Sequence, residues 1–426
     1  MIKAVFVSMR NIRELTEENF DQYVQIIQSA FPGTQYELPD AGANLRERFA
    51  LAQKQDTSTE YYGLFDDETM LGSMRLHHYT MNVYSQLLPV GGVGLVAVDF
   101  MRKKEKVGRD MLSFFLHYFR DRGVSIVLLN PFRVDFYKQM GFGVGTKVYQ
   151  YRVHPSQIQN KGIKKHITRV TKRDYELVLD CYQRCVERQH GMIAKTEMEA
   201  RFMFADPDYH TVAYKKDGKV EGYLVFAFKR LNPEDNFSAS DLIVKEWFYE
   251  TPEALSELCS FLSSQADQIH RVIINTQEED FYHVLTDPSN GYDSLLPGSN
   301  IQMYTTGVGA MYRVIHVAKL FVDLSNHNFG GKTMTVEIRV QDKFLPENQE
   351  STLVHFQAGR ASVWTEGTPD VIIELDISDF SSLIIGSISF QKLLDYSLVK
   401  VSDPAFVMEL DQLFHVAQKP ICTTSF

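Results

Sequence analysis

Two similar patterns of strand, helix and hairpin follow one another in the first two thirds of this chain. The segment from Ile12 to Phe20 is matched by the segment from Ile167 to Tyr175, and each predicts a short strand, a threonine N-cap and an amphipathic helix. At nearly the same offset, stretches 61–76 and 211–226 each have a polar turn between two apolar runs, and both predict hairpins. One such match is weak evidence, but two matches in the same order predict two copies of one α/β fold.

The remaining third of the chain has a different pattern. Thr335–Val340 alternates strictly, Val371–Asp376 is typical of a strand, and Ser378 begins an apolar helical stretch. A chain of 426 residues is expected to form two to three domains. We therefore expect an α/β and α+β protein with domains at residues 1–153, 154–302 and 303–426.

Charge and composition narrow the function classes. The net charge of −10 and a pI of about 5.7 disfavour nucleic acid and favour cationic ligands. The N-terminal apolar run is too short for a signal peptide, and no run approaches the length of a membrane span, so we expect a cytoplasmic protein without a membrane span. Cys181 and Cys185 lie one helical turn apart with His190 nearby, but such thiols are mostly core residues, so no metal is expected.

A basic loop joins a predicted strand at 91–98 to an amphipathic helix that begins near Val107. Its cations are Arg102, Lys103, Lys104 and Lys106, although the start of a helix normally favours acidic side chains. Free backbone N–H groups together with local positive charge suit a bound polyphosphate. The alternative interpretation is a solvated basic turn. The second copy has no such loop. The corresponding connection contains no cation and carries two glutamates, Glu250 and Glu253.

The second informative stretch runs from Asn130 to Gly143 and follows a predicted strand at 124–129. It ends Phe136-Tyr137-Lys138-Gln139-Met140-Gly141-Phe142-Gly143. These aromatic residues are either plain core residues or the wall of a site that uses the Tyr137 hydroxyl.

Both stretches resemble segments of the GNAT N-acetyltransferases. The loop is similar to their pyrophosphate-binding pattern [Q/R]-x-x-G-x-[G/A], read here as Lys103-Lys104-Glu105-Lys106-Val107-Gly108. It departs twice, with Lys103 at the Gln/Arg position and Lys106 at the first glycine. The Tyr137 segment resembles the short GNAT helix whose tyrosine lies beside the cofactor sulfur. The third domain resembles the sterol-carrier-protein fold.

Taken together, the chain resembles the enhanced intracellular survival (Eis) acetyltransferases, which acetylate amines of aminoglycosides and other cationic substrates. The resemblance implies acetyl-CoA as co-substrate, Tyr137 as proton donor, the α-carboxylate of Phe426 as base, and a homo-oligomer, a hexamer in that family. It also implies that acetyl-CoA contacts the strand residues Val96, Ala97 and Val98 and the loop residues Lys103, Lys104, Glu105, Lys106, Val107, Gly108 and Arg109.

This assignment fits the chemistry of acetyl transfer. An amine with a pKa of ~10.4 is protonated at neutral pH, so a base must remove a proton before attack on the thioester. The departing thiolate needs a hydrogen-bond donor, which Tyr137 can supply. A backbone N–H of Val96 or Val98 is the expected donor to the tetrahedral oxyanion.

Two alternatives stay open at the level of sequence. The first is a non-catalytic protein of the same fold that binds acyl-CoA or lipid. The second is a related acyltransferase that uses longer acyl chains or peptide N-termini. The amine pocket is not defined by the sequence, and Tyr36, Glu37 and Asp40 are candidates only because they follow the first helix.

Overall fold

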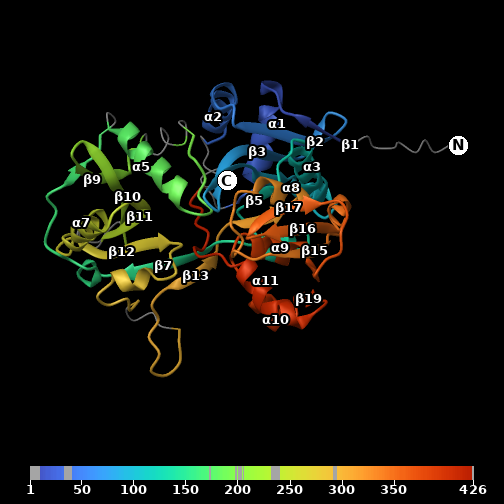
Figure 1. The fold of residues 1–426 in the computed structure, drawn as a ribbon. Coiled ribbons are helices and arrows are strands. Elements are labelled where there is room, and N and C mark those ends of the chain that lie inside the picture. The colour runs from blue at the N-terminus through green and yellow to red at the C-terminus, as the bar shows by residue number, and fades with distance from the viewer. Residues whose placement is uncertain are drawn as a thin grey trace.

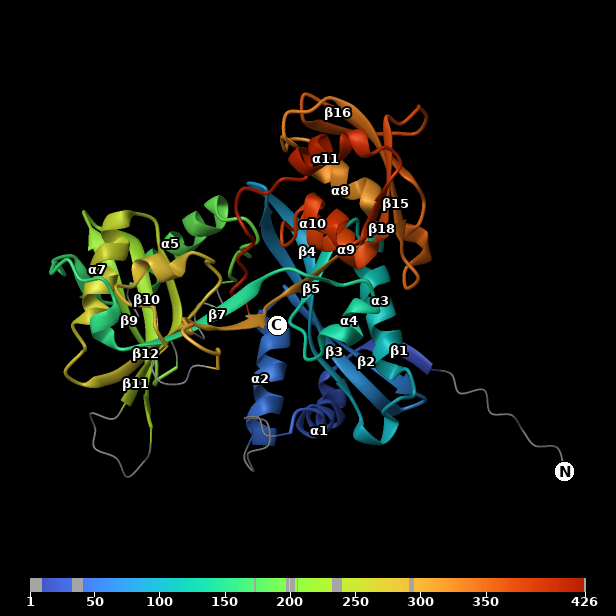
Figure 2. The same cartoon turned by 90° about the horizontal axis from the view of Figure 1, so that it is seen from below.

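The computed structural model describes residues 10–32, 41–171, 174–196, 199, 204, 206–231, 240–290 and 295–424. They form two sheets that resemble one another and a third, smaller sheet (Figures 1 and 2). In Figure 1 the green and yellow second unit lies to one side, while the blue-to-teal first unit and the orange-to-red third unit pack together on the other. No helix within the described ranges has the length and apolar character that a membrane crossing requires.

The first sheet carries helices on both faces. One apolar core joins it to the first two helices and another joins it to the helices that follow β4 and β5. The strand order is β1 (Arg10–Glu14), β2 (Thr59–Asp66), β3 (Thr69–Val83), β4 (Gln86–Val98), β5 (Ile126–Leu129), β14 (Met311–Val314) and β6 (Gly143–Val144). The helices are α1 (Phe20–Ala30), α2 (Ala41–Gln55), α3 (Val107–Asp121) and α4 (Val134–Lys138).

The second sheet repeats this arrangement, which confirms the two-copy prediction. In both sheets three antiparallel pairings are followed by one parallel pairing, β4 with β5 and β11 with β12. The order is β13 (Thr305–Val308), β7 (Lys147–Val153), β12 (Ile269–Thr276), β11 (Ser240–Tyr249), β10 (Lys219–Arg230), β9 (His210–Lys216) and β8 (Ile167–Arg169). Separate cores join it to α5 (Tyr175–Arg188) and α7 (Pro252–Ser263).

The two predicted threonine caps lie three residues before the N-caps of their helices, which are Asn19 for α1 and Asp174 for α5. Thr16 forms a capping box with Asn19 around the short 3-10 turn that leads into α1. In the second copy the N-cap of α5 is Asp174, and Thr171 instead donates its N–H and hydroxyl to the Asp174 carboxylate, at 3.1 and 2.8 Å. Thr171 is therefore not the N-cap of α5, because a hydrogen-bonded turn like that between Thr16 and Asn19 separates it from the helix.

The chain crosses between the two large sheets at two adjacent places. Gly145 and Thr146 connect β6 of the first sheet to β7 of the second, and Gly309 and Ala310 connect β13 of the second to β14 of the first. The crossings hydrogen-bond to each other, with Gly145 N–H to Ala310 O at 3.1 Å and Gly309 N–H to Thr146 O at 2.9 Å. The sheets are thus built across the boundaries expected at residues 153 and 302.

The third unit has an α+β fold, as predicted, and its apolar core is continuous with that of the first sheet. Buried residues of β3 and β14, such as Met81 and Tyr312, belong to the same cluster as Phe356 and Phe380 of the third unit. Its strand order is β17 (Arg360–Trp364), β16 (Thr352–Gln357), β15 (Met334–Gln341), β18 (Val371–Asp376) and β19 (Val399–Val401). The helices are α8 (Val317–Asp323), α9 (Ile377–Ile384), α10 (Phe390–Asp395) and α11 (Val407–Leu413).

All three units meet at a stack of aromatic rings. The Tyr84 ring lies between those of His190 and His327, with centroid separations of 4.7 and 4.2 Å. His190 Nδ1 accepts from the Tyr84 N–H at 3.2 Å, and Nε2 faces Ile385 O at 3.1 Å, so the ring is neutral. Burial lowers the pKa of both histidines to about 4, and the nearby Arg360 adds to the effect at His327.

We expect this stack to destabilise the fold in mild acid. Each histidine has a lower pKa folded than its unfolded value of about 6.5, so the unfolded chain binds more protons below that pH. Stability should fall as the pH drops from about 6.5 toward 4, by about 1 kcal/mol at pH 5.5 for His190. Urea unfolding at pH 7.5 and 5.5 measures this, and His190→Gln should flatten the dependence. An unchanged dependence in that variant would contradict the assignment.

Candidate active site

The central strands of the first sheet separate toward one edge. Within the continuous range 41–171, β4 and β5 pair only at Gly91–Val127 and Gly92–Leu128, whereas β4 stays paired with β3 as far as Val98. A bulge between the pairs Ser73–Ala97 and Arg75–Gly94 places two residues opposite one, and Leu95 there has φ +46°. Beyond these two pairs the described residues of β4 and β5 are not hydrogen-bonded to one another, and we refer to this unpaired side of β4 as the gap.

The strand residues predicted to contact acetyl-CoA point to different faces. Val96 and Val98 pack at the edge of the core that contains Val107 and Tyr137. Ala97 is buried on the opposite face in the core of α1. Side-chain contact with a ligand in the gap is therefore open to Val96 and Val98, while Ala97 can offer only its backbone.

The basic loop ends in an uncapped helix start. Lys106 is the N-cap of α3 with φ +66°, and its side chain forms no cap. The N–H groups of Val107, Gly108 and Arg109 therefore lack partners within the helix. A Cβ on Gly108 would lie 3.7 Å from Val98 Cγ2 and 3.8 Å from Phe136 Cζ. Gly108, in the first turn of α3, therefore lies beside both the end of β4 and the α4 helix.

The charge of this loop is predominantly positive. Glu105 accepts from Arg10, with Nη2 to Oε2 at 3.1 Å, and lies 3.8 Å from Arg102. The exposed cations Lys103, Lys104, Lys106 and Arg109 form no ion pair with another described residue. Uncapped N–H groups beside cations without ion-pair partners are a combination that favours a bound anion.

The Tyr137 side chain lies in α4 and is 3% exposed. Its ring contacts Phe132, Phe136 and Phe142 edge-on, with centroid distances between 5.1 and 6.0 Å. Burial raises the pKa of the Tyr137 hydroxyl, so the group keeps its proton at neutral pH. The hydroxyl forms no hydrogen bond with any residue that the structure describes, which leaves it available as a donor.

The equivalent helix start in the second copy is closed. Thr251 caps α7 by accepting the Ala254 N–H, and Pro252 removes one N–H at the first helical position. Glu250 binds Arg184, with Oε1 to Nη2 at 2.6 Å, and lies 3.5 Å from Lys219. A bound anion would meet a carboxylate there, and two of the three N–H groups of the first turn are capped or missing.

A cavity of about 1010 Å³ lies between the second copy and the rest of the molecule. It begins at Asn130 and Pro131, where β5 ends, and extends past the ends of β11 and β12. Its acidic lining residues are Glu246, Glu250, Glu278, Glu279 and Asp280, and its basic ones are Arg188, Lys245 and Lys419. Burial raises the pKa of Glu278, whose carboxylate accepts one described hydrogen bond, from the Tyr249 hydroxyl at 2.8 Å.

The segment after α11 forms one wall of this cavity, shown in red between the second unit and the rest in Figure 1. Gln277 fixes it by two hydrogen bonds to the Cys422 backbone, at 2.7 and 2.8 Å, and Ile421 N–H donates to His190 O at 2.9 Å. The described chain ends in this wall at Thr424. Phe426 lies outside the described residues, as do Tyr36, Glu37 and Asp40.

Cys181 and Cys185 are core residues. Both are buried beside Tyr182 and Val186 between α5 and the second sheet. Within the described residues no group of His, Cys, Asp and Glu side chains is arranged to hold a metal ion.

Sequence reasoning missed one contact at the edge of this site. Arg313 and the loop from Asp342 reach the end of α4 from a part of the chain assigned to the third domain. The available signal was an arginine inside the apolar strand Met311–Val314, because a buried charge requires a partner.

Comparison with known proteins agrees with this architecture. Family models for GNAT acetyltransferase domains match residues 11–145 and 185–314, and a sterol carrier protein domain model matches residues 324–423. No curated protein matches the sequence significantly.

Several solved structures have the same fold over 98% of this chain and 100% of their own. A GCN5-related N-acetyltransferase from Anabaena variabilis has a TM-score of 0.80 at 16% identity. A probable N-acyltransferase from Enterococcus faecalis has 0.78 at 20%, and Eis1 from Mycobacterium abscessus has 0.76 at 18%.

The chain is therefore an acetyl-CoA-dependent N-acetyltransferase built from two GNAT domains and a sterol-carrier-protein-like domain. The order and arrangement of its domains are Eis-like, which confirms the fold predicted from the sequence.

If the basic loop binds the pyrophosphate, charge reversal there should weaken acetyl-CoA binding. Lys103→Glu combined with Lys104→Glu should raise the Kd by about 10- to 100-fold, because charge-assisted hydrogen bonds are replaced by repulsion. Titration calorimetry measures the Kd. Lys164→Glu with Lys165→Glu is the matched control, since it changes the net charge equally at exposed positions of the second domain. Equal affinities for both double variants would remove the loop from the site.

Proposed function

We propose that this enzyme acetylates amines of a cationic substrate, such as an aminoglycoside or a lysine side chain, in the first GNAT domain. The observation that carries the proposal is the convergence of the uncapped, cationic start of α3, the gap beside β4 and Tyr137 on one space. The second domain has the same fold but a capped, acidic helix start, so we assign acetyl-CoA binding to the first domain alone.

Each element of the site has a distinct task in this proposal. The N–H groups of Val107, Gly108 and Arg109 and the cations of the loop hold the pyrophosphate of acetyl-CoA. The gap beside β4 receives the pantetheine arm, and a backbone N–H of Val96 or Val98 stabilises the oxyanion. The Tyr137 hydroxyl donates a hydrogen bond and then a proton to the leaving thiolate.

The base in this proposal is the α-carboxylate of Phe426. A carboxylate with a pKa of ~3.5 in water becomes a stronger base when it is desolvated. The last described residue, Thr424, lies in the wall of the cavity that begins at the end of β5, which supports a position close to the first domain. The carboxylates of the cavity, Glu278 in particular, favour a cationic acceptor approaching from this side.

We further propose a cytoplasmic homo-oligomer, by analogy with the hexamers of the Eis family. Light scattering on the purified protein measures the assembly. Thiol release with a panel of acyl-CoA donors and amines separates this function from a longer-chain acyltransferase and from a non-catalytic binder, which would release no thiol.

Replacing Tyr137 by phenylalanine should slow turnover and leave binding intact. The change removes one proton donor from a ring that otherwise keeps its packing, and such donors are worth ~10²–10⁴-fold in rate. Steady-state thiol release should therefore show a lower kcat, with the acetyl-CoA Kd nearly unchanged. Phe142→Leu, in the same aromatic cluster but without a hydroxyl, is the control for packing. Wild-type turnover of Tyr137→Phe would make Tyr137 a core residue only.

Extending the chain by one glycine after Phe426 tests the base. The extension replaces the carboxylate with a peptide carbonyl, which cannot accept the amine proton. Acetyl transfer should be lost, while the melting temperature and the acetyl-CoA Kd stay close to those of the unextended protein. A glycine added at the N-terminus is the matched control. Full activity of the C-terminally extended protein would exclude the terminal carboxylate as base.

A further inference from the structure

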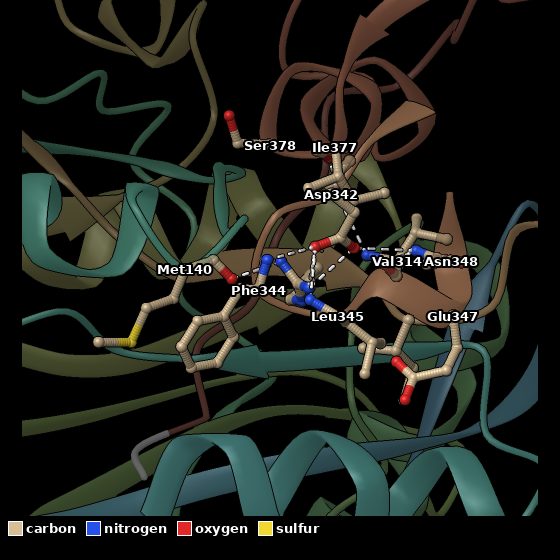
Figure 3. Close-up of polar contacts among 12 residues, drawn as sticks. Met140, Val314, Asp342, Phe344, Leu345, Glu347, Asn348, Ile377 and Ser378 are labelled. Carbon is tan, nitrogen blue, oxygen red and sulfur yellow. Dashed lines mark hydrogen bonds and ion pairs between the residues drawn. The ribbon is translucent and has the colours of Figure 1, made fainter. Parts of the chain in front are cut away.

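Arg313 is a completely buried arginine between the first and third domains. Figure 3 shows the polar contacts around its partner, Asp342. It belongs to β14, the strand that returns from the second sheet into the first. One guanidinium nitrogen, Nη1, donates to Met140 O. The other, Nη2, lies 2.8 and 2.9 Å from the two carboxylate oxygens of Asp342, which is also fully buried.

Asp342 organises a loop of the third domain around this contact. Its carboxylate also accepts the N–H groups of Phe344 and Leu345, at 3.2 and 2.9 Å, and the Asn348 amide at 3.3 Å. Asn348 in turn donates to Val314 O at 3.2 Å, and so holds the loop to β14. We refer to residues 342–348 as the Asp342 loop.

The hydrogen bond from Arg313 to Met140 O lies just after the end of α4, the helix that carries Tyr137. α4 has only five residues, and the turn that ends it is closed by Met140 N–H to Tyr137 O at 3.0 Å. The guanidinium packs on Gly141, whose φ is +83°, and a Cβ there would lie 1.4 Å from Nη1. Because so short a helix has little stability of its own, its direction depends on what anchors its end.

The same loop also contacts the helix that begins at the basic loop. Leu345 is fully buried in the core shared with Tyr137 and Met140. The Phe344 ring lies 5.6 Å from the Arg109 guanidinium, in the first turn of α3. Glu347 O accepts from Arg120 Nη2 at 3.2 Å, further along that helix.

Stability alone does not account for this arrangement. A buried ion pair can often be replaced by apolar residues of similar size without loss of stability, because burial of the charges is costly. Here the cost is visible, since burial lowers the pKa of Arg313 and its Nε has no hydrogen-bond partner in the structure. What an apolar pair could not reproduce is the bond from Nη1 to Met140 O.

We propose that Arg313 and Asp342 are positioning residues for acetyl transfer, through which the third domain fixes Tyr137 relative to the start of α3. This inference rests on the proposed role of Tyr137. It makes the sterol-carrier-like domain a structural part of the acetyl-transfer site, although none of its described residues needs to touch the reacting atoms.

The test compares an Arg313 variant in two backgrounds. Arg313→Met with Asp342→Leu removes the anchor and keeps a packed apolar interface. It should lower kcat by about 10²-fold, since small misplacements of a reacting group have effects of that size. In the Tyr137→Phe background the same change should cost less than about twofold under single-turnover conditions, because there is no hydroxyl left to misplace.

Two further variants complete the design. Arg313→Lys keeps the charge but cannot reach Met140 O and both Asp342 oxygens together. If the double variant does not fold, Arg313→Lys is compared in the same two backgrounds instead. Ser125→Ala removes a different contact between the first and third domains, the 2.7 Å bond to Asp323, and should leave kcat unchanged.

The outcomes separate this inference from the proposed function. Equal losses of turnover in both backgrounds would overturn the positioning role, as would wild-type kcat in the Arg313 variants. Wild-type turnover of Tyr137→Phe alone would instead contradict the proposed function, and the inference that rests on it would fall for that reason.

Discussion

The two chain crossings between the large sheets determine where everything else lies. At each crossing two residues leave one sheet and enter the other, and the paired crossings share hydrogen bonds between Gly145, Thr146 and Ala310. Close packing leaves no freedom there, since a Cβ on Gly145 would lie 2.1 Å from the Tyr312 ring. The two GNAT domains are therefore joined by two adjacent crossings that are hydrogen-bonded to each other.

The two copies show how little separates a helix start that can bind an anion from one that cannot. Their strands have the same order, and α3 and α7 each follow a central strand, β4 and β11. In the first copy the N-cap is a lysine in the left-handed conformation and offers free N–H groups. In the second, a threonine cap and a proline occupy or remove two of those groups, and the buried Glu250 adds a negative charge. Three or four residues at one turn therefore change how strongly each helix start favours an anion.

Local patterns made much of this predictable from the sequence. The basic loop, the Tyr137 segment and the strand β18 all depend on residues close together in the chain, and Val371–Asp376 was bounded correctly. The contact between Arg313 and Asp342 was not predicted, because it joins residues that only the crossing at Gly309 and Ala310 brings to the first domain. A strand pattern indicates that a strand forms, but it does not identify the sheet that the strand enters.

The left-handed conformation of Lys106 has a further consequence. At that φ a lysine is less stable than a glycine by roughly 1 kcal/mol, so the loop holds its shape at a cost that contacts with a ligand can offset. The same exposed turn presents Lys103, Lys104 and Lys106 in succession, each of them a cleavage point for trypsin. A pyrophosphate seated on the adjacent N–H groups would cover these peptide bonds. If acetyl-CoA binds here as proposed, the rate of proteolytic nicking at this turn would report how much of the enzyme carries its acyl donor.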